Sequence, residues 1–288
     1  MLHILCCLFL NFTPVDSIVS APIIISELTI QGNKTTKLPI ITRELSFQKG
    51  DTLFSHELDK KIEQSKQNLM NTALFNFVYI NKFFIDSAQV KITIDLKEAW
   101  YLWPNPIFEV FSRNFNEWWL TKDLYKVSYG LYLSQYNFRG RNETVSIGAR
   151  HGYTQSYFLR YSIPYINKSQ NHGLSFSVSY SQNHEIIYQT FNNKIVFHRN
   201  DENFTRKQFE ALSQYTFRKG YYATHGLYIN YKNYAVTEDV LSLNPDYFSK
   251  QKPSAEYLSF GYWFRFDRRD FKPYPLKGYF MQYDLLKA

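Results

Sequence analysis

A run of charged side chains near the end of the sequence, Asp267 to Asp270, is the strongest candidate for chemistry. Carboxylates beside arginines can form an acid–base pair, but they also form salt-bridged turns and line water-filled lumens. No nucleophile motif accompanies them, because the 7 histidines are dispersed and no Gly-x-Ser-x-Gly sequence occurs. We therefore interpret the run as a salt-bridged turn or as charge facing a lumen.

Metal and thiol chemistry lack the necessary ligands. His184 and Glu185 are adjacent, but the second histidine that a zinc site needs is missing. The 2 cysteines, Cys6 and Cys7, lie at the N-terminus and leave the rest of the chain without a disulfide or a thiol nucleophile. We predict a protein that is not an enzyme and that needs no cofactor or metal.

Alternation of apolar and polar residues dominates the middle of the chain. Between residues 145 and 180, three runs place Val, Ile, Leu, Phe, Tyr or Ala at every second position, mostly with small or polar residues between them. A period of two predicts extended strands with one apolar and one hydrophilic face. Such faces are typical of a barrel wall, with lipid outside and water inside.

The composition agrees with this interpretation. Aromatic residues make up 19% of the chain, yet the mean hydropathy is −0.39. Beyond the N-terminus, no run reaches the roughly 18 apolar residues of a spanning helix. The net charge of +8 is scattered without a long Lys/Arg cluster, so we predict no nucleic-acid partner.

Further alternating runs extend the pattern to about nine strands, at roughly 20 residues for each strand and turn. The expected strands are 107–111, 126–134, 145–150, 157–165, 173–180, 208–217, 226–231, 258–266 and 279–285. Short connections at 167–172 and Gly220 should lie at one end of the barrel. The long polar segments 192–205 and 237–254 should lie at the other end, facing out.

Four tryptophans stand on either side of the first expected strand. Trp100, Trp103, Trp118 and Trp119 are expected to cluster where the preceding module meets the membrane, as an interfacial belt. The alternative is that these side chains pack the barrel onto that module.

The N-terminus resembles an export signal. Residues 2–12 form a short apolar run, and small residues follow up to Ala21, so we predict a signal peptide over 1–21. A basic n-region is missing, and Pro22 would follow the cleavage site. A buried apolar segment is the alternative.

Residues 22–100 predict a small α+β module of the order β-α-α-β-β. The expected strands are 23–30, 75–85 and 90–96. A short helix should begin near Pro39, and a longer amphipathic helix should follow Ser55 as its N-cap.

This module resembles a polypeptide-transport-associated (POTRA) domain. The resemblance is in the order and spacing of Gly32-Asn33, Thr36, Arg43-Glu44-Leu45, Gly50-Asp51, Asn68-Leu69 and Leu74-Phe75. It implies a periplasmic module that handles unfolded outer-membrane chains, partly by pairing them to a sheet edge. We expect that edge at Phe77, Val78, Tyr79 and Ile80. A POTRA domain that only positions the barrel is the alternative.

Residues 101–288 resemble the barrel of the outer-membrane protein assembly factor superfamily, the bacterial surface antigen barrels of the BamA and TamA type. The segments PNPIFEVFSRNFNEWW, QYNFRGRNETVSIGARHG and FDRRDFKPYPLKGYF carry the resemblance. Within the last segment, the family motif falls on Asp267, Arg269, Asp270, Pro275 and Gly278. The resemblance implies an antiparallel transmembrane β-barrel in the bacterial outer membrane, with the POTRA domain in the periplasm.

Two family features are missing. The family's Val-Arg-Gly-Phe/Tyr motif is absent, and the last residues lack an aromatic terminal strand signal. The family barrel has about sixteen strands, so we interpret residues 101–288 as its first half, in a fragment or a truncated gene product. An intact eight-stranded barrel is the alternative.

The resemblance implies an insertion factor for outer-membrane proteins. Its first barrel strand, at Ile107, Phe108, Glu109, Val110 and Phe111, would form a weak seam that opens to client strands. The partners would be unfolded outer-membrane proteins, outer-membrane lipid and accessory assembly subunits. A two-partner-type protein translocation pore, a small passive barrel and a soluble β-rich binding protein are the alternatives.

Overall fold

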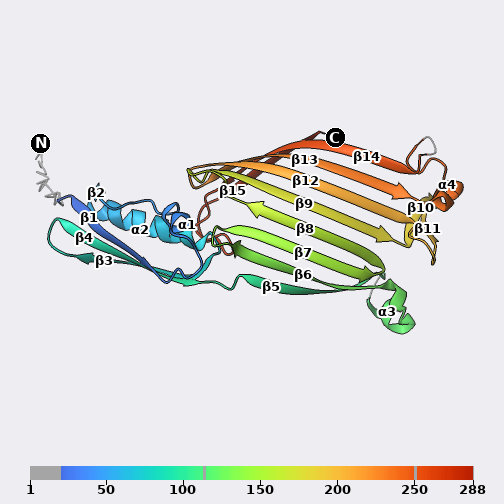
Figure 1. Ribbon diagram of the computed structural model, residues 1–288, viewed down its shortest axis with the longest axis horizontal. Coiled ribbons are helices and arrows are strands. Elements are labelled where there is room, and N and C mark those ends of the chain that lie inside the picture. The colour runs from blue at the N-terminus through green and yellow to red at the C-terminus, as the bar shows by residue number, and fades with distance from the viewer. Residues whose placement is uncertain (1–20, 113–114, 250–251, 288) are drawn as a thin grey trace, which may run out of the picture.

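The computed structural model describes residues 21–112, 115–249 and 252–287, so the predicted signal peptide lies almost entirely outside the described residues. Two parts follow each other along the chain (Figure 1): a small α+β module at the N-terminal end and a broad, curved antiparallel sheet. None of the helices in the described part is long and apolar enough to cross a membrane.

The N-terminal module is a four-stranded sheet covered by two helices. Its strands have the order β2-β1-β4-β3, with β1 and β4 parallel and the other pairs antiparallel. Its elements are β1 (Ile23–Gln31), α1 (Leu38–Thr42), β2 (Thr52–Leu53), α2 (Ser55–Met70), β3 (Phe75–Phe84) and β4 (Gln89–Glu98). The predicted β-α-α-β-β order is therefore present, with the two-residue strand β2 added.

The core of this module comes from one face of each element. Ile25, Ile92 and Ile94 on the sheet meet Leu58 and Leu69 on α2, and all are buried. Their spacing at two residues on strands and at helical intervals on α2 is what places them on one side. The predicted N-cap Ser55 is wrong by one residue, because Ser55 is the first helical residue and Phe54 is the N-cap. The N–H of Phe54 donates to the carboxylate of Glu57 at 3.3 Å, which completes the first turn without a hydroxyl cap.

The second part is a nine-stranded antiparallel sheet in the order β15-β14-β13-β12-β9-β8-β7-β6-β5. This confirms the nine strands expected from the alternation. The strands are β5 (Leu102–Val110), β6 (Val127–Phe138), β7 (Glu143–Gly152), β8 (Thr154–Ile163), β9 (His172–Asn183), β12 (Arg206–Lys219), β13 (Ala223–Val236), β14 (Ser254–Asp267) and β15 (Phe280–Lys287). In the described part of the chain, β5 and β15 are the two edges and do not pair with each other.

The register keeps the apolar side chains on one face across the sheet. Val178 on β9 lies opposite Leu159 on β8 and Ala211 on β12, and Ala211 in turn lies opposite Tyr231 on β13. The opposite face carries small and polar residues such as Ser179, whose neighbours include Glu210. The apolar face is exposed, with Val178 at 44%, as expected for a wall that lipid covers.

The end of the sheet far from the module holds the longer connections (Figure 1). Part of the predicted loop 192–205 is instead a strand, and it forms a hairpin with the residues before it. This hairpin and two helices, with a 3-10 turn, make up that end: β10 (Glu185–Phe191), β11 (Lys194–Arg199), α3 (Phe115–Thr121), α4 (Glu238–Leu243) and η1 (Leu124–Lys126). Val240 of α4 packs against Ile186 of β10 and Val236 of β13 in a small core, which explains why the polar loops fold there.

The tryptophan cluster predicted beside the module is wrong. Trp103 lies at the start of β5, whereas Trp118 and Trp119 lie in α3 after its end, so β5 separates the two groups. An aromatic belt at each membrane surface has this arrangement, because a strand that crosses the hydrocarbon carries its flanking residues to opposite interfaces.

A lysine placed on either face tests which side meets lipid. We predict that Val178→Lys destabilises the sheet in phospholipid vesicles by about 2–4 kcal/mol, because the charge enters hydrocarbon. The adjacent change Ser179→Lys should cost much less, since it brings the lysine beside Glu210 on the polar face. Urea titration of the two variants in vesicles measures both values, and equal losses would contradict the assignment of faces.

Candidate functional site

Among the residues that the structure describes, the edge strand β5 pairs with β6 on one side of its backbone and with no strand on the other side. The N–H of Phe111 donates to the carbonyl of Lys126 at 2.8 Å, and the N–H of Tyr136 donates to the carbonyl of Tyr101 at 2.8 Å. Backbone groups alternate in direction along an antiparallel strand, so residues of the same parity as 101 and 111 face β6. The N–H and C=O groups of Phe108 and Val110 therefore point to the free edge.

The side chains of the predicted seam, Ile107 to Phe111, also alternate. Phe108 lies opposite Tyr129 on the apolar face and is 67% exposed. Glu109 lies on the polar face, where its carboxylate pairs with Arg150 at 2.8 Å. The edge thus presents an apolar side chain to lipid and free backbone groups to any adjoining strand.

The module has its own free edge at β3. The N–H of Ile85 donates to the carbonyl of Gln89 at 2.9 Å, which sets the alternation along this strand. Val78 and Ile80 therefore direct their backbone groups outward while their side chains pack on the core. Phe77 and Tyr79 pair with β4 and expose their rings, at 50% and 57%, on the face away from the helices. The four residues predicted as a pairing edge thus divide into two that offer backbone groups and two that offer aromatic surface.

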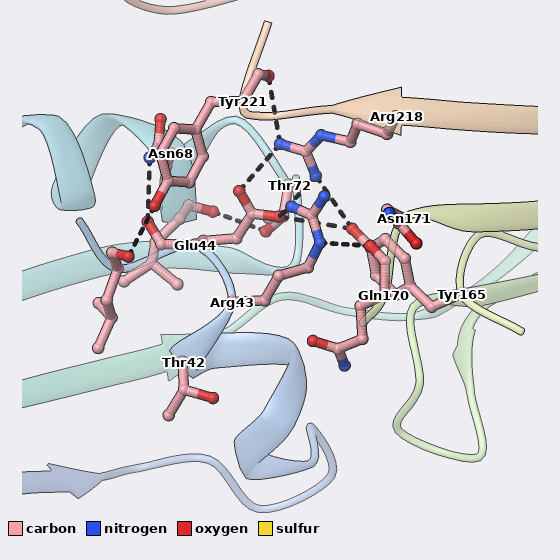
Figure 2. A network of polar contacts seen from close by, with 12 residues as sticks. Thr42, Arg43, Glu44, Asn68, Thr72, Tyr165, Gln170, Asn171, Arg218 and Tyr221 are labelled. Atoms are coloured by element: carbon pink, nitrogen blue, oxygen red, sulfur yellow. Dashed lines mark hydrogen bonds and ion pairs between the residues drawn. The ribbon is translucent and has the colours of Figure 1, made fainter. Parts of the chain in front are cut away.

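A buried carboxylate joins the module to the sheet (Figure 2). The side chain of Glu44 is 1% exposed, and it accepts hydrogen bonds from Arg218 at 2.7 and 3.0 Å. Arg43 pairs with the same carboxylate at 2.7 Å and donates to the carbonyl of Gln170 at 2.7 Å. Burial, reinforced by the charge of Glu44, raises the pKa of Tyr165, so its hydroxyl stays neutral and donates to Glu44 at 3.4 Å. Two cations and a hydroxyl therefore share one carboxylate between the two parts.

A second contact lies at the turn between β6 and β7. The amide of Asn137 donates to the hydroxyl oxygen of Thr36 at 2.8 Å, and the N–H of Lys37 donates to the carbonyl of Gly140 at 2.9 Å. The Thr36 hydroxyl in turn donates to the carboxylate of Glu98 at 2.6 Å. Partial burial opposes ionisation of Glu98, but hydrogen bonds from Thr36 and from the N–H of Thr35 outweigh it and lower its pKa.

The family motif forms a third contact, in the turn between β14 and β15. Arg269 holds Asp267 with two hydrogen bonds of 2.8 Å, and the carboxylate of Asp270 accepts the N–H groups of residues 271, 276 and 277 at 2.9–3.1 Å. Gly278 has a φ of +94°, and a side chain there would collide with the carbonyl of Arg268. These bonds support the predicted salt-bridged turn, in which Pro275 is also located.

The motif turn contacts the module through Asn71, the residue that ends α2. Its amide donates to the carbonyl of Asp270 at 3.0 Å and accepts the N–H of Lys272 at 2.9 Å. Between this turn, α2 and Arg218 lies a polar cavity of about 480 Å³. All four turns at this end of the sheet contact the module, since Tyr221 also donates to the carbonyl of Leu45 at 2.7 Å.

Sequence reasoning missed the role of Glu44 and Arg218. Glu44 stood out only as part of the POTRA resemblance, and Arg218 is 174 positions away in an ordinary alternating strand. No local pattern connects them. Within the described residues, no group of three His, Cys, Asp or Glu side chains could hold a metal ion.

A periplasmic module seated on the end of a sheet with a lipid-facing wall defines an outer-membrane barrel protein. The Omp85 superfamily domain model matches residues 137–285, and the POTRA model described as surface antigen variable number repeat matches residues 23–99. The chain belongs to the Omp85 superfamily, and its place is the bacterial outer membrane with the POTRA domain in the periplasm. Proteins of this family are insertion and transport factors rather than enzymes.

Solved structures of the same fold include BamA from Haemophilus ducreyi lacking POTRA domains 1–3, with a TM-score of 0.52 and 15% identity over 91% of this chain and 47% of that one. CdiB from Acinetobacter baumannii matches with a TM-score of 0.46 and 13% identity over 92% of this chain and 46% of that one. CdiB from Escherichia coli matches with a TM-score of 0.41 and 12% identity over 85% of this chain and 42% of that one. The chain thus spans less than half the length of these structures. The comparison with curated proteins gave no match.

Removing Arg218 tests the buried contact. We predict that Arg218→Ala loosens the module from the sheet at a cost of at most about 3–5 kcal/mol, because Arg43 still neutralises part of the Glu44 charge. Spin labels on Glu63→Cys and Asp201→Cys, in a chain with Cys6 and Cys7 replaced by Ser, should show a broader distance distribution. Arg206→Ala, at the other end of the same strand, is the control and should leave the distribution narrow.

The Glu98 contact should depend on pH. Because the folded pKa is lowered, its stabilisation is complete above the ordinary value of 4.5 and is lost as pH falls through the folded pKa. We predict that the melting temperature of the wild type exceeds that of Glu98→Gln near neutral pH and that the gap closes below pH 4.5. A gap that stays constant down to about pH 3 would contradict this role of Glu98.

Proposed function

We propose that this chain is an insertion factor for outer-membrane proteins, which captures unfolded barrel chains on β3 and assists their insertion at β5. The observation that carries the proposal is the pair of free strand edges, one on the POTRA domain and one in the barrel wall. The contacts around Glu44, Thr36 and Asn71 fix the position of one edge relative to the other. The domain division behind it is a signal peptide at 1–21, the POTRA domain at 22–100 and barrel strands at 101–288.

The β3 edge suits a periplasmic client. An extended chain can add to β3 through the outward backbone groups of Val78 and Ile80, because strand addition needs only a row of N–H and C=O groups. The exposed rings of Phe77 and Tyr79 offer apolar surface beside that row. This combination recognises unfolded barrel strands by backbone and alternation rather than by a particular sequence.

The β5 edge suits the same client at a later stage. An unpaired backbone group costs several kcal/mol in hydrocarbon, so a strand that enters lipid needs its partners beforehand. Phe108 and Val110 would supply these partners at the boundary of the wall. The process needs no catalytic residue, cofactor or energy source in this chain, and its partners are unfolded outer-membrane proteins, lipid and accessory assembly subunits.

Assembly of a client barrel in vesicles tests the proposal. With the chain reconstituted in phospholipid vesicles, a small outer-membrane barrel protein diluted from urea should fold faster than in empty vesicles. Deletion of residues 105–113 should abolish the acceleration. Unchanged assembly, together with ion conductance in planar bilayers, would instead support a translocation pore.

A proline introduced into β3 tests whether the backbone edge or the side chains of this strand bind the client. We predict that Ile80→Pro weakens capture of the unfolded client about tenfold, because it removes an outward N–H and obstructs strand addition. Ile80→Ala is the matched control, since it removes the same side chain and keeps the N–H. Fluorescence anisotropy of the labelled client measures both affinities, and equal weakening would show that the side chain rather than the edge matters.

A further inference from the structure

The free edge of β5 is interrupted at two positions. Pro104 lies opposite Leu133 and Pro106 lies opposite Leu131, in the same parity as Phe108. Their nitrogens therefore point away from β6, which is why two prolines fit in this strand without breaking its ladder. A proline has no N–H, so both positions present only a carbonyl to the free edge.

A third edge-facing carbonyl in this half of β5, that of Leu102, already accepts a hydrogen bond within the chain. The indole of Trp100 donates to the carbonyl of Leu102, the first edge-facing residue of β5. The indole of Trp103 donates to the carbonyl of Trp100 at 3.0 Å, and so holds the preceding segment in place. The half of β5 next to the POTRA domain thus has one occupied carbonyl and two missing donors.

The other half of β5 has no such interruption. Phe108 and Val110 each offer an N–H and a C=O to the free edge. The contrast is specific to β5, because neither β3 nor β15 contains a proline. Edge prolines block strand addition in natural sheets, and here they cover only one half of the edge.

We propose that β5 accepts an added strand only along its distal half, at Phe108 and Val110, and stays unpaired beside Pro104 and Pro106. This inference rests on the proposed function and adds to it where along the edge a client pairs. The occupant is an extended client segment with apolar side chains at alternate positions. Phe108 on the lipid face and Glu109 on the polar face require this pattern.

The chemistry of the proximal half explains the restriction. An added strand could donate its N–H groups to the carbonyls of Pro104 and Pro106, but its own carbonyls would meet no donor there. In hydrocarbon these carbonyls would remain unpaired, which is unfavourable. The proximal half therefore stays open between the wall and the lipid, on the side from which the POTRA domain presents the client.

Disulfide trapping with a defined peptide tests the proposal. The probe copies residues 257–266 of β14, with cysteine in place of Tyr262. The chain, with Cys6 and Cys7 replaced by Ser, carries either Leu102→Cys or Val110→Cys and is reconstituted in phospholipid vesicles. Mass spectrometry should find about tenfold more trapping at 110 than at 102. Adding Pro104→Ala and Pro106→Ala should raise trapping at 102 to the level at 110.

A proline introduced into the open half provides the converse test. Phe108→Pro should lower trapping at Val110→Cys about tenfold, whereas the control Phe108→Ala, which removes the same ring but keeps the N–H, should lower it much less. Because the nitrogen of residue 108 points to the free edge, β5 should keep its pairing with β6.

Each other outcome has a distinct meaning. Equal trapping at 102 and 110 without any proline change would overturn the restriction and leave strand addition at β5 intact. Absence of trapping in every variant would overturn strand addition itself and the proposed function with it. A disulfide between two copies of the chain at 110, formed in the presence of the peptide and in preference to it, would overturn the client as occupant.

Discussion

The structure depends on one constraint: a backbone polar group in hydrocarbon has no water to pair with, so it needs a partner within the protein. Nine strands satisfy most of these groups by pairing with neighbours, and the register aligns apolar side chains such as Leu159, Val178 and Ala211 on the side that meets lipid. The unsatisfied groups collect at the edges of the sheet. The proposed function depends on these edges, so the backbone groups of the edge strands are its candidate site.

The POTRA domain is held to the wall by polar contacts and by Tyr165, whose ring packs against the core of the domain. Glu44 is buried between Arg43 and Arg218, and removal of either arginine would leave the carboxylate with only one cation to compensate its charge. Hydrogen bonds have strict geometry, so the four turns that contact the module define one orientation. The family motif acts in this interface: Asp267 and Arg269 shape a turn whose backbone meets Asn71.

The two candidate edges differ in a way that follows from their surroundings. β3 faces water, where an unpaired N–H is solvated and an uninterrupted edge costs little. β5 faces hydrocarbon, and its prolines leave fewer donors in need of a partner along the half nearest the POTRA domain. The remaining groups at Phe108 and Val110 are the ones with most to gain from an added strand.

Local patterns in the sequence were sufficient for the elements and for the faces of the strands. A period of two is a property of extended backbone itself, so Val178 and Ser179 could be assigned to opposite faces before any strand order was known. The POTRA module and the motif at Asp267 to Gly278 were likewise readable from spacing. The hairpin of β10 and β11 was not, because Ile186 of β10 is buried only by contact with the distant residues Val236 and Val240.

Only the tertiary structure decided what joins the two parts and which backbone groups remain free. Glu44 and Arg218 meet because strand pairing carries a distant turn to the end of α2, and no local signal records that distance. Pro104 and Pro106 were visible in the sequence, but their meaning required the strand order and the direction of their nitrogens. Sequence determines local conformation through short-range sterics, whereas an edge exists only once the pairing of all other strands is known.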